Sequence, residues 1–187
     1  MTKSELRKIY VQEREKFSST EIANLSSKIL TNLKILPIWE FSVFHCFVSI
    51  KEKNEINTTE IINYLFEQNK TVVVPKILDK NMISCEINSK SQWAYGSFNV
   101  SEPIDYKEIN SKKIDVILLP MLICDKKGNR IGYGGGFYDR FLKKCNPNIL
   151  KIGINFFEPI DLISDVFTSD VPLDYCVTSD KVVSFSS

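Results

Sequence analysis

Residues 129–140 read Asn-Arg-Ile-Gly-Tyr-Gly-Gly-Gly-Phe-Tyr-Asp-Arg, and they hold four of the 7 glycines of the chain. Glycine loses more backbone entropy on folding than any other residue, so this cluster indicates positive φ angles or close approach of the backbone to another group. The run at residues 114–120, Ile-Asp-Val-Ile-Leu-Leu-Pro, is typical of a buried strand. Phe137, Phe141 and Leu142 recur at helical spacing. The predicted order is strand, long loop, glycine turn and helix.

A glycine turn that opens a helix presents free N–H groups and the positive end of the helix dipole, which together favour an anion such as phosphate. Arg130 and Arg140 flank the turn and suit a phosphate or a carboxylate, and Asp139 suits Mg²⁺. The alternative is a tight turn without a ligand. The spacing matches neither of the standard nucleotide loops, G-x-x-x-x-G-K-[ST] and G-x-G-x-x-G.

The rest of the chain has the pattern of a layered α/β fold. Capping boxes that begin at Thr2 and Ser18 predict two helices, and Pro37 ends the second. A third helix, capped near Asn57, lies between two apolar runs, so we expect a β-α-β unit and a mostly parallel sheet. A hairpin is predicted near residues 79–81, at the edge of the sheet. The predicted strands are residues 43–48, 71–75, 114–120 and 151–156, and residues 170–178 are predicted to supply a loop and a final strand.

In open α/β sheets, ligands bind where the carboxyl ends of the strands meet. We therefore expect the segments that follow Val48, Leu119 and Phe156 to converge on one cleft. On a helical wheel, three basic residues of the first helix fall within a narrow arc beside an apolar stripe. They either lean inward toward a site or form a solvated basic face. These residues are Lys3, Arg7 and Arg14.

Two further features leave two interpretations each. The aromatic pair Trp93 and Tyr95 either lies against a flat ligand or closes one end of the core. His45, the one histidine, lies in an apolar strand and is either a satisfied core residue or a catalyst, and a core residue is the commoner case. Cys46 and Cys176 lie in apolar runs and are expected to be plain core residues.

The composition excludes several classes of protein. A net charge of +1 from 24 basic and 23 acidic residues gives no global field for nucleic acid or an anionic membrane. The 5 cysteines are widely spaced and form no C-x-x-C pair, which favours free thiols in a reducing compartment. The N-terminus has no hydrophobic signal core, and no apolar stretch approaches the length of a membrane span. We expect one domain over residues 1–187, cytoplasmic and monomeric.

The sequence resembles the 5-formyltetrahydrofolate cyclo-ligases, also called methenyltetrahydrofolate synthetases, nearly from end to end. The resemblance begins with residues 3–7, Lys-Ser-Glu-Leu-Arg, and continues through Phe47-Val48-Ser49 followed by Glu55. It includes the turn that runs from Gly96 to Glu102-Pro103 and the glycine motif of residues 130–140. Its last matching positions are Asp170, Asp174 and Thr178.

This resemblance implies an α/β fold of the Rossmann-like, NagB/RpiA/CoA-transferase-like kind. It implies an enzyme that uses ATP and Mg²⁺ to convert 5-formyltetrahydrofolate into 5,10-methenyltetrahydrofolate, with release of ADP and phosphate. By the family's pattern, Asp139 and Asp170 would hold Mg²⁺, and the catalytic positions would be Gly135, Tyr138 and Arg140. The residues implied to bind ATP are Lys3, Ser4, Glu5, Leu6, Arg7, Arg130, Ile131, Gly132, Tyr133, Gly134, Gly135, Gly136, Phe137 and Tyr138. The residues implied to face the folate are Val48, Glu55, Tyr133, Gly134, Gly135, Gly136 and Phe137.

One position departs from this pattern. Many relatives carry a lysine in the middle of the glycine motif, where this chain has Gly135. If the lysine supplies charge at the transferred phosphate, Arg14, Arg130 or Arg140 must compensate. Two other functions stay open from the sequence: an ATP-dependent ligase or kinase that acts on another small carboxylate, and a non-catalytic regulatory homologue that binds folate or nucleotide.

Overall fold

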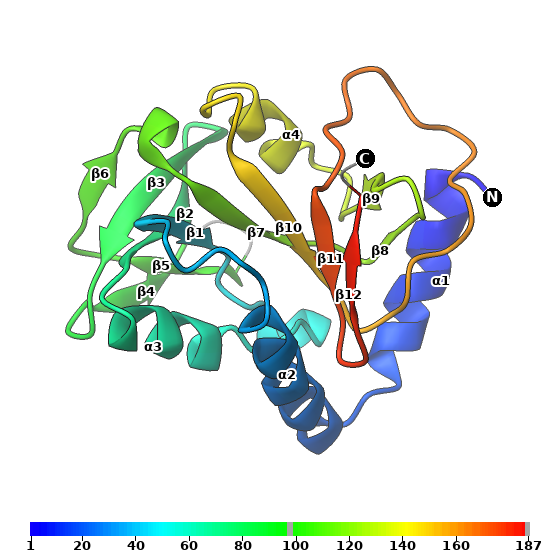
Figure 1. The fold of residues 1–187 in the computed structure, drawn as a ribbon, viewed down its shortest axis with the longest axis horizontal. Coiled ribbons are helices and arrows are strands. Elements are labelled where there is room, and N and C mark those ends of the chain that lie inside the picture. Colours follow the sequence, from blue (N-terminus) through cyan, green and yellow to red (C-terminus); the bar gives the residue numbers. More distant parts are fainter. Residues whose placement is uncertain (97–98, 186–187) are drawn as a thin grey trace.

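The computed structural model describes residues 1–96 and 99–185. An eight-stranded sheet with the strand order β12-β11-β10-β7-β1-β2-β3-β6 forms its centre (Figure 1). The neighbouring strands from β11 to β2 are all parallel, whereas β12 at one end and β3 and β6 at the other pair antiparallel. The predicted α/β class with a mostly parallel sheet is therefore confirmed.

The elements have the following bounds. The strands of the large sheet are β1 (Val43–Cys46), β2 (Thr71–Leu78), β3 (Asn81–Ile87), β6 (Lys107–Ile109), β7 (Val116–Pro120), β10 (Leu150–Ile154), β11 (Tyr175–Val177) and β12 (Val182–Ser184). Two small two-stranded sheets consist of β4 (Trp93–Tyr95) with β5 (Ser101–Pro103) and of β8 (Ile123–Cys124) with β9 (Arg130–Ile131). The helices are α1 (Lys3–Glu15), α2 (Ser19–Leu33), α3 (Thr59–Glu67) and α4 (Phe137–Leu142), with short 3-10 turns η1 (Lys51–Lys53) and η3 (Ser111–Lys113).

Both predicted capping boxes are present. The Thr2 side chain accepts a hydrogen bond from the Glu5 amide, and the Glu5 carboxylate accepts one from the Thr2 amide, so α1 begins at Lys3. Ser18 and Glu21 do the same at the start of α2. Reciprocal caps of this kind satisfy two backbone donors that the helix itself leaves unpaired, which is why both starts are predictable from sequence.

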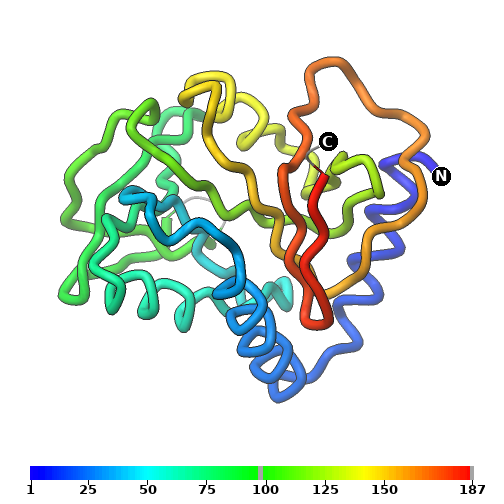
Figure 2. The backbone as a smooth tube through the Cα atoms, in the orientation of Figure 1, coloured from blue at the N-terminus to red at the C-terminus, as the bar shows by residue number. Residues whose placement is uncertain are grey.

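The sheet separates two layers of core, with α2 and α3 on one face and α4 on the other (Figures 1 and 2). Successive side chains of a strand point to opposite faces, so Phe44 packs toward α2 and α3 whereas Ile117 packs toward α4. His45 and all five cysteines are buried, and the cysteines are free thiols. Neither ring nitrogen of His45 has a hydrogen-bond partner in the described part of the chain, so His45 is a core residue but not a satisfied one.

The hairpin between β2 and β3 is confirmed, because Asp79 and Lys80 both have positive φ angles of 46° and 67°, as the tightest hairpin turns require. The sheet continues one strand further, to β6. Trp93 and Tyr95 lie in β4 and are 38% and 76% exposed, so the interpretation as a plug of the core is wrong. The short strands β4, β5, β6, β8, β9 and β12 were not predicted.

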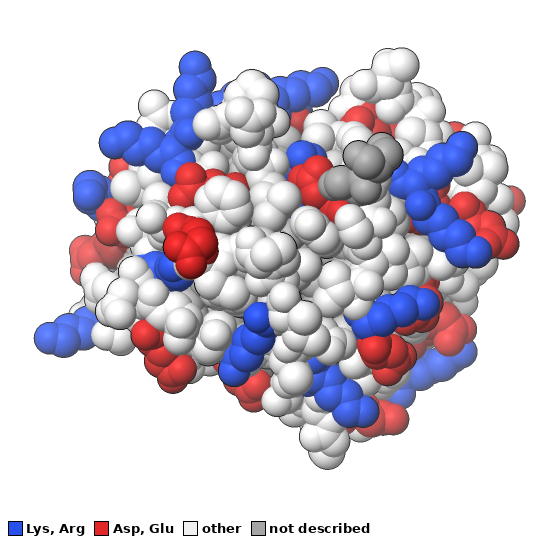
Figure 3. All heavy atoms as spheres, viewed as in Figure 1, with Lys and Arg blue, Asp and Glu red and all other residues white. Residues whose placement is uncertain are grey.

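The surface and the helices are of ordinary character. On the face shown in Figure 3, the basic and acidic side chains of the described residues are interspersed, in keeping with the net charge of +1. No helix among residues 1–96 and 99–185 is both long enough and apolar enough to cross a membrane.

Candidate functional site

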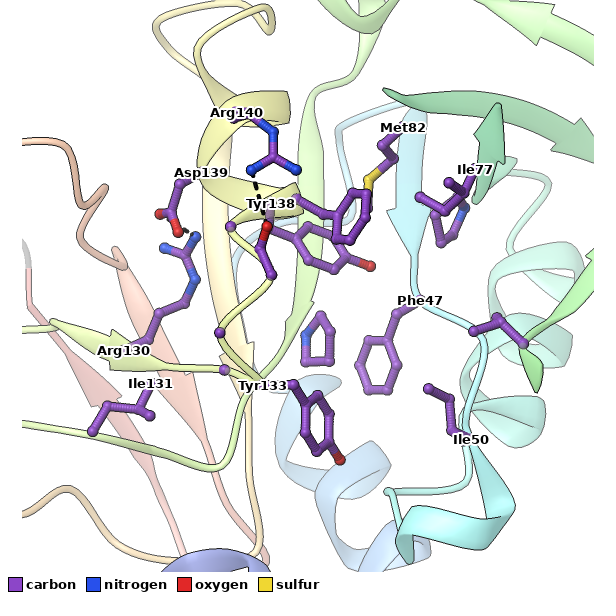
Figure 4. Close-up of a pocket in the computed structure, with 18 of the residues that line it drawn as sticks. Phe47, Ile50, Ile77, Met82, Arg130, Ile131, Tyr133, Tyr138, Asp139 and Arg140 are labelled. Atoms are coloured by element: carbon purple, nitrogen blue, oxygen red, sulfur yellow. Dashed lines mark hydrogen bonds and ion pairs between the residues drawn. The ribbon is translucent and has the colours of Figure 1, made fainter. Parts of the chain in front are cut away.

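A cavity of about 700 Å³ opens at the carboxyl end of the parallel strands. Three of the segments that line it are residues 47–55 after β1, the glycine loop that follows β7, β8 and β9, and residues 167–170 in the connection from β10 to β11. Figure 4 shows side chains of the first two of these segments pointing toward one another across the cavity. The predicted convergence of these three connections on one cleft is therefore confirmed.

The glycine loop depends on residues without a side chain at two positions. Gly134 has a φ angle of 96°, and Gly136, which caps the start of α4, has a φ angle of 64°. Other residues adopt such angles only at a cost in strain. A Cβ on Gly134 would also stand 3.5 Å from the guanidinium carbon of Arg7, so the loop backbone passes close to α1.

Helix α1 turns its basic face into the molecule. Lys3 and Arg7 line the cavity, and Arg7 Nε donates to the Gly132 carbonyl at 2.9 Å. Arg14 is 3% exposed and donates to the Tyr133 hydroxyl at 3.0 Å and to the Met121 carbonyl at 2.6 Å. The alternative of a solvated basic face is thus wrong.

The residues between Lys3 and Arg7 do not line the cavity, although the resemblance implies that they bind ATP. Residues four apart share a helix face, whereas the three residues between them point elsewhere. Ser4 is exposed, Glu5 serves the cap of α1, and Leu6 is buried in a small apolar cluster with Ile123. Their connection to a ligand stays a prediction without geometric support.

The two predicted metal ligands both line the cavity, and each is paired with a cation. Arg130 Nη2 donates to Asp139 at 2.8 Å, and Lys3 Nζ forms an ion pair with Asp170. Burial raises the pKa of Asp170, but hydrogen bonds from Lys3 and from the Phe167 amide outweigh it, so this pKa lies below its ordinary value. Burial lowers the pKa of the Arg130 guanidinium, and the negative charge of Asp139 opposes this shift only in part.

These carboxylates fit Mg²⁺ in a particular way. Among the described residues no group of three or more histidine, cysteine or acidic side chains is placed to hold a metal ion. Mg²⁺ commonly takes only one or two carboxylates from a protein and completes its octahedron with water and phosphate oxygens. The donor set of Asp139 and Asp170 therefore suits a Mg²⁺ ion that arrives with a phosphate-bearing ligand.

The other half of the cavity is apolar. Figure 4 shows Phe47, Ile50, Ile77 and Met82 across the cavity from Arg130 and Asp139, with the glycine loop between the two halves. Glu55 lies at this end, is 5% exposed, and accepts a hydrogen bond from the Ile50 amide at 2.7 Å. Burial raises the pKa of Glu55 despite this hydrogen bond and the nearby charge of Arg14.

The aromatic residues of the glycine motif lie between these halves. The Nζ of Lys53 lies over the ring of Tyr133, 4.2 Å from the ring centroid. Burial raises the pKa of the Tyr133 hydroxyl. The Tyr138 ring meets the His45 ring edge-on, with 6.0 Å between the ring centroids. Burial raises the pKa of the Tyr138 hydroxyl well above its ordinary value. Arg140 lies over the ring of Phe137 and donates to the Gly135 carbonyl at 2.9 Å (Figure 4).

The structure brings together most of the residues singled out in the sequence. Besides Lys3 and Arg7, the cavity is lined by Val48, Glu55, all residues from Arg130 to Arg140, and Asp170. Sequence reasoning missed a further set of lining residues, which comes from η1, the β2–β3 hairpin, β5 and its flank, the end of α4, and the β10–β11 connection. These residues are Lys53, Pro75, Ile77, Met82, Val100, Glu102, Lys143, Phe167 and Ser169, together with Phe47 and Ile50 after β1 and Pro120 at the end of β7. The local cues to them were the hairpin signal near residues 79–81, the predicted strand that ends at Pro75, and the turn with Glu102 that carries part of the resemblance.

Comparison with known proteins gives one consistent result. Residues 1–178 match the model of the 5-formyltetrahydrofolate cyclo-ligase family. The chain is 30% identical to the 5-formyltetrahydrofolate cyclo-ligase of Mycoplasma genitalium, over 92% of this chain and 93% of that one. It is 26% identical to a probable 5-formyltetrahydrofolate cyclo-ligase of Schizosaccharomyces pombe, over 98% of each.

Solved structures agree with this result. The 5,10-methenyltetrahydrofolate synthetase of Aquifex aeolicus superposes with a TM-score of 0.87 at 30% identity, over 100% of this chain and 94% of that one. The synthetase of Mycoplasma pneumoniae gives a TM-score of 0.76 at 26% identity, over 96% and 99%. A cavity with a glycine loop, paired acids and bases, and an apolar half is present in a chain that matches over almost its whole length. The chain belongs to the 5-formyltetrahydrofolate cyclo-ligase family, whose activity implies the use of ATP.

Proposed function

We propose that this protein converts 5-formyltetrahydrofolate into 5,10-methenyltetrahydrofolate in an ATP- and Mg²⁺-dependent reaction that releases ADP and phosphate. The observation that carries the proposal is the division of one cavity into a charged half and an apolar half by the glycine loop. Its volume of about 700 Å³ lies within the usual range for small-molecule sites, roughly 300–1,000 Å³.

The charged half suits the phosphates of ATP. Lys3, Arg7 and Arg130 supply positive charge on one side of the glycine loop, and the loop itself can approach a ligand with its backbone because two of its φ angles are positive. In phosphoryl transfer there is little covalent chemistry for the protein to perform, so positioning and charge stabilisation account for most of the catalysis. Mg²⁺, held by Asp139 and Asp170, would neutralise charge on the phosphates.

The apolar half suits the planar ring system of the folate. Phe47, Ile77 and Met82 provide apolar contact, and Glu55 offers a carboxyl group to polar atoms of the ring edge. In the proposed sequence the formyl oxygen attacks the γ-phosphorus of ATP and displaces ADP, which gives an iminium phosphate. N10 then attacks the activated carbon, phosphate leaves, and the N10 proton passes to water or phosphate. This sequence requires no general base from the protein.

Arg140 is the arginine that best replaces the lysine found in many relatives at the position of Gly135. Arg14 is buried against Tyr133 and Met121, and Arg130 is paired with Asp139, whereas Arg140 is held at the Gly135 carbonyl itself. We therefore assign to Arg140 the stabilisation of negative charge on the transferred phosphoryl group. Tyr138 and Gly135 would shape the space around that group.

The test is the growth of absorbance in the methenyl-folate band when the protein is mixed with 5-formyltetrahydrofolate, ATP and Mg²⁺. The expected result is a rise that needs all three. A rise with another carboxylate substrate instead would favour the ligase or kinase alternative, and folate binding without turnover would favour the regulatory homologue.

The five buried free thiols are in keeping with a cytoplasmic location, which remains a prediction, as do a monomer and a single domain over residues 1–187.

A further inference from the structure

Phe167 is an exposed aromatic side chain at the charged end of the cavity. The residue is 61% exposed and lines the cavity together with Lys3 and Asp170, and Lys3 Nζ lies 4.8 Å from the centroid of its ring. A single exposed apolar residue is unremarkable on a protein surface. What distinguishes Phe167 is its place beside the groups that we propose to hold phosphate and Mg²⁺.

The loop that carries Phe167 is tied to the start of α1. The Ser164 amide donates to the Met1 carbonyl at 3.0 Å, and the Lys3 amide donates to Asp165 Oδ1 at 2.5 Å. Figure 2 shows this connection between β10 and β11 running alongside α1. The ring is therefore presented from a segment with fixed partners.

Phe167 is also linked directly to one of the proposed Mg²⁺ ligands. Its amide donates to Asp170 Oδ2 at 2.7 Å, and the Asp170 amide donates to its carbonyl at 3.0 Å. These hydrogen bonds hold the backbone of Phe167 at a set distance from the carboxylate. A nucleotide whose phosphates lie near Lys3 and Asp170 would thus have its base within reach of this ring.

We propose that Phe167 is the platform on which the base of the nucleotide stacks, next to Lys3 and Asp170, which face the phosphates. This inference rests on the proposed function, because it assumes that the phosphates occupy the charged half. The folate ring is the other flat part of the substrates, but its apolar compartment of Phe47, Ile77 and Met82 lies across the glycine loop.

The chemistry of stacking on Phe167 determines which ligands this residue can distinguish. An aromatic face stacks on any base, since every base has a π-face, and stacking is tolerant of the base's identity. Phe167 therefore adds affinity for a nucleoside triphosphate over bare polyphosphate, and it does not by itself separate ATP from GTP.

The experiment compares the Mg²⁺ complexes of ATP and of inorganic tripolyphosphate, with dissociation constants measured by calorimetry in the absence of folate. Phe167→Ala should weaken ATP binding roughly tenfold and leave tripolyphosphate binding unchanged, in line with the energy of base stacking. Val166→Ala is the matched control, because Val166 is the neighbouring residue, is 40% exposed, and does not line the cavity. It should bind both ligands as the wild type does.

Phe167→Trp provides a second test that keeps an aromatic ring. It should bind ATP at least as tightly as the wild type, and its added indole fluorescence should be quenched by ATP and not by tripolyphosphate. Equal weakening of both ligands in Phe167→Ala would overturn the proposal and indicate support of Asp170 instead. Unchanged ATP binding, or a loss confined to 5-formyltetrahydrofolate, would overturn it too. Absence of ATP binding by the wild type would instead contradict the proposed function itself.

Discussion

Arg130 Nη2 donates to the Asp139 carboxylate at 2.8 Å, so a base and an acid of the glycine motif, nine residues apart, are already paired at the wall of the cavity. The same guanidinium donates to the Val171 carbonyl, next to Asp170. Arg130 thus contacts one of the two acids that we propose to hold Mg²⁺ and the residue next to the other. A Mg²⁺ ion at this place would share the Asp139 carboxylate with Arg130. We therefore expect the negative charge of Asp139 to matter more for metal binding than the shape of its side chain.

Asp139→Asn should lower turnover by at least ~10²-fold and leave the fold intact, since the substitution removes the charge of a metal ligand and keeps its volume. The measurement is the initial rate of methenyl-folate formation at saturating ATP over a range of Mg²⁺ concentrations. Asp161→Asn is the matched control, because Asp161 is an acid with an 89% exposed side chain that pairs with Lys126. Near-normal activity of Asp139→Asn would remove Asp139 from the metal site.

Arg140→Met should lower kcat by roughly 10²-fold and change the KM for 5-formyltetrahydrofolate little, because a charge that acts on the transferred phosphoryl group stabilises the transition state more than the bound substrate. Lys144→Met, which removes an exposed cation of the same region outside the cavity lining, serves as the control. If Arg140→Met raised KM and left kcat unchanged, Arg140 would be a residue of substrate binding instead.

Gly96→Ala should destabilise the fold by about 1–3 kcal/mol, the usual cost of overpacking. A Cβ at this position would lie 2.1 Å from Glu102 Oε2, and Glu102 is 5% exposed with Oε1 bonded to the Ile77 amide at 3.0 Å. Gly132→Ala meets nothing within 4 Å and should stay within about 0.5 kcal/mol of the wild type. Urea unfolding of the two variants checks the difference, and equal midpoints would contradict it.

The parts of the fold that sequence predicts are those with local signals. The caps at Thr2 and Ser18, the hairpin turn at residues 79–80 and the parallel strands each depend on residues close together in the chain. The short strands β8 and β9 have two residues each and exist because the loop folds back on itself. No local pattern marks them.

The site divides in the same way. The glycine loop is visible in the sequence, whereas the ion pair of Lys3 with Asp170 joins residues 167 apart in the chain, and the resemblance to a family was needed to connect them. Phe167 has no sequence signal apart from its nearness to Asp170. For Trp93 and Tyr95 the sequence allowed two interpretations. Their strand pairs with β5 at the surface, which removes the plug of the core, and neither residue is among the described residues that line the cavity, so contact with a flat ligand gains no support from the structure.

His45 should make the stability of this protein depend on pH. Burial lowers the pKa of His45 to about 3, and contact with its own backbone opposes this only in part. In the unfolded chain the pKa is about 6.5, so the unfolded state binds one more proton between these values. The free energy of unfolding is therefore fully retained above pH 6.5 and falls by up to about 1.4 kcal/mol per pH unit as the pH decreases below it.

His45→Leu removes this term and keeps an apolar side chain against Tyr138 and Phe141. Urea unfolding at pH 7 and at pH 5 gives the loss of unfolding free energy of each protein between the two pH values. The loss of the wild type should exceed that of the variant by about 2 kcal/mol, because the slope above acts over the roughly 1.5 pH units between pH 6.5 and pH 5. Glu55 and the other carboxyl groups titrate in both proteins, so their contribution cancels in this comparison. Equal losses in the two proteins would mean that His45 gains a proton in the folded state, and hence that the core admits water or a partner at its ring nitrogens.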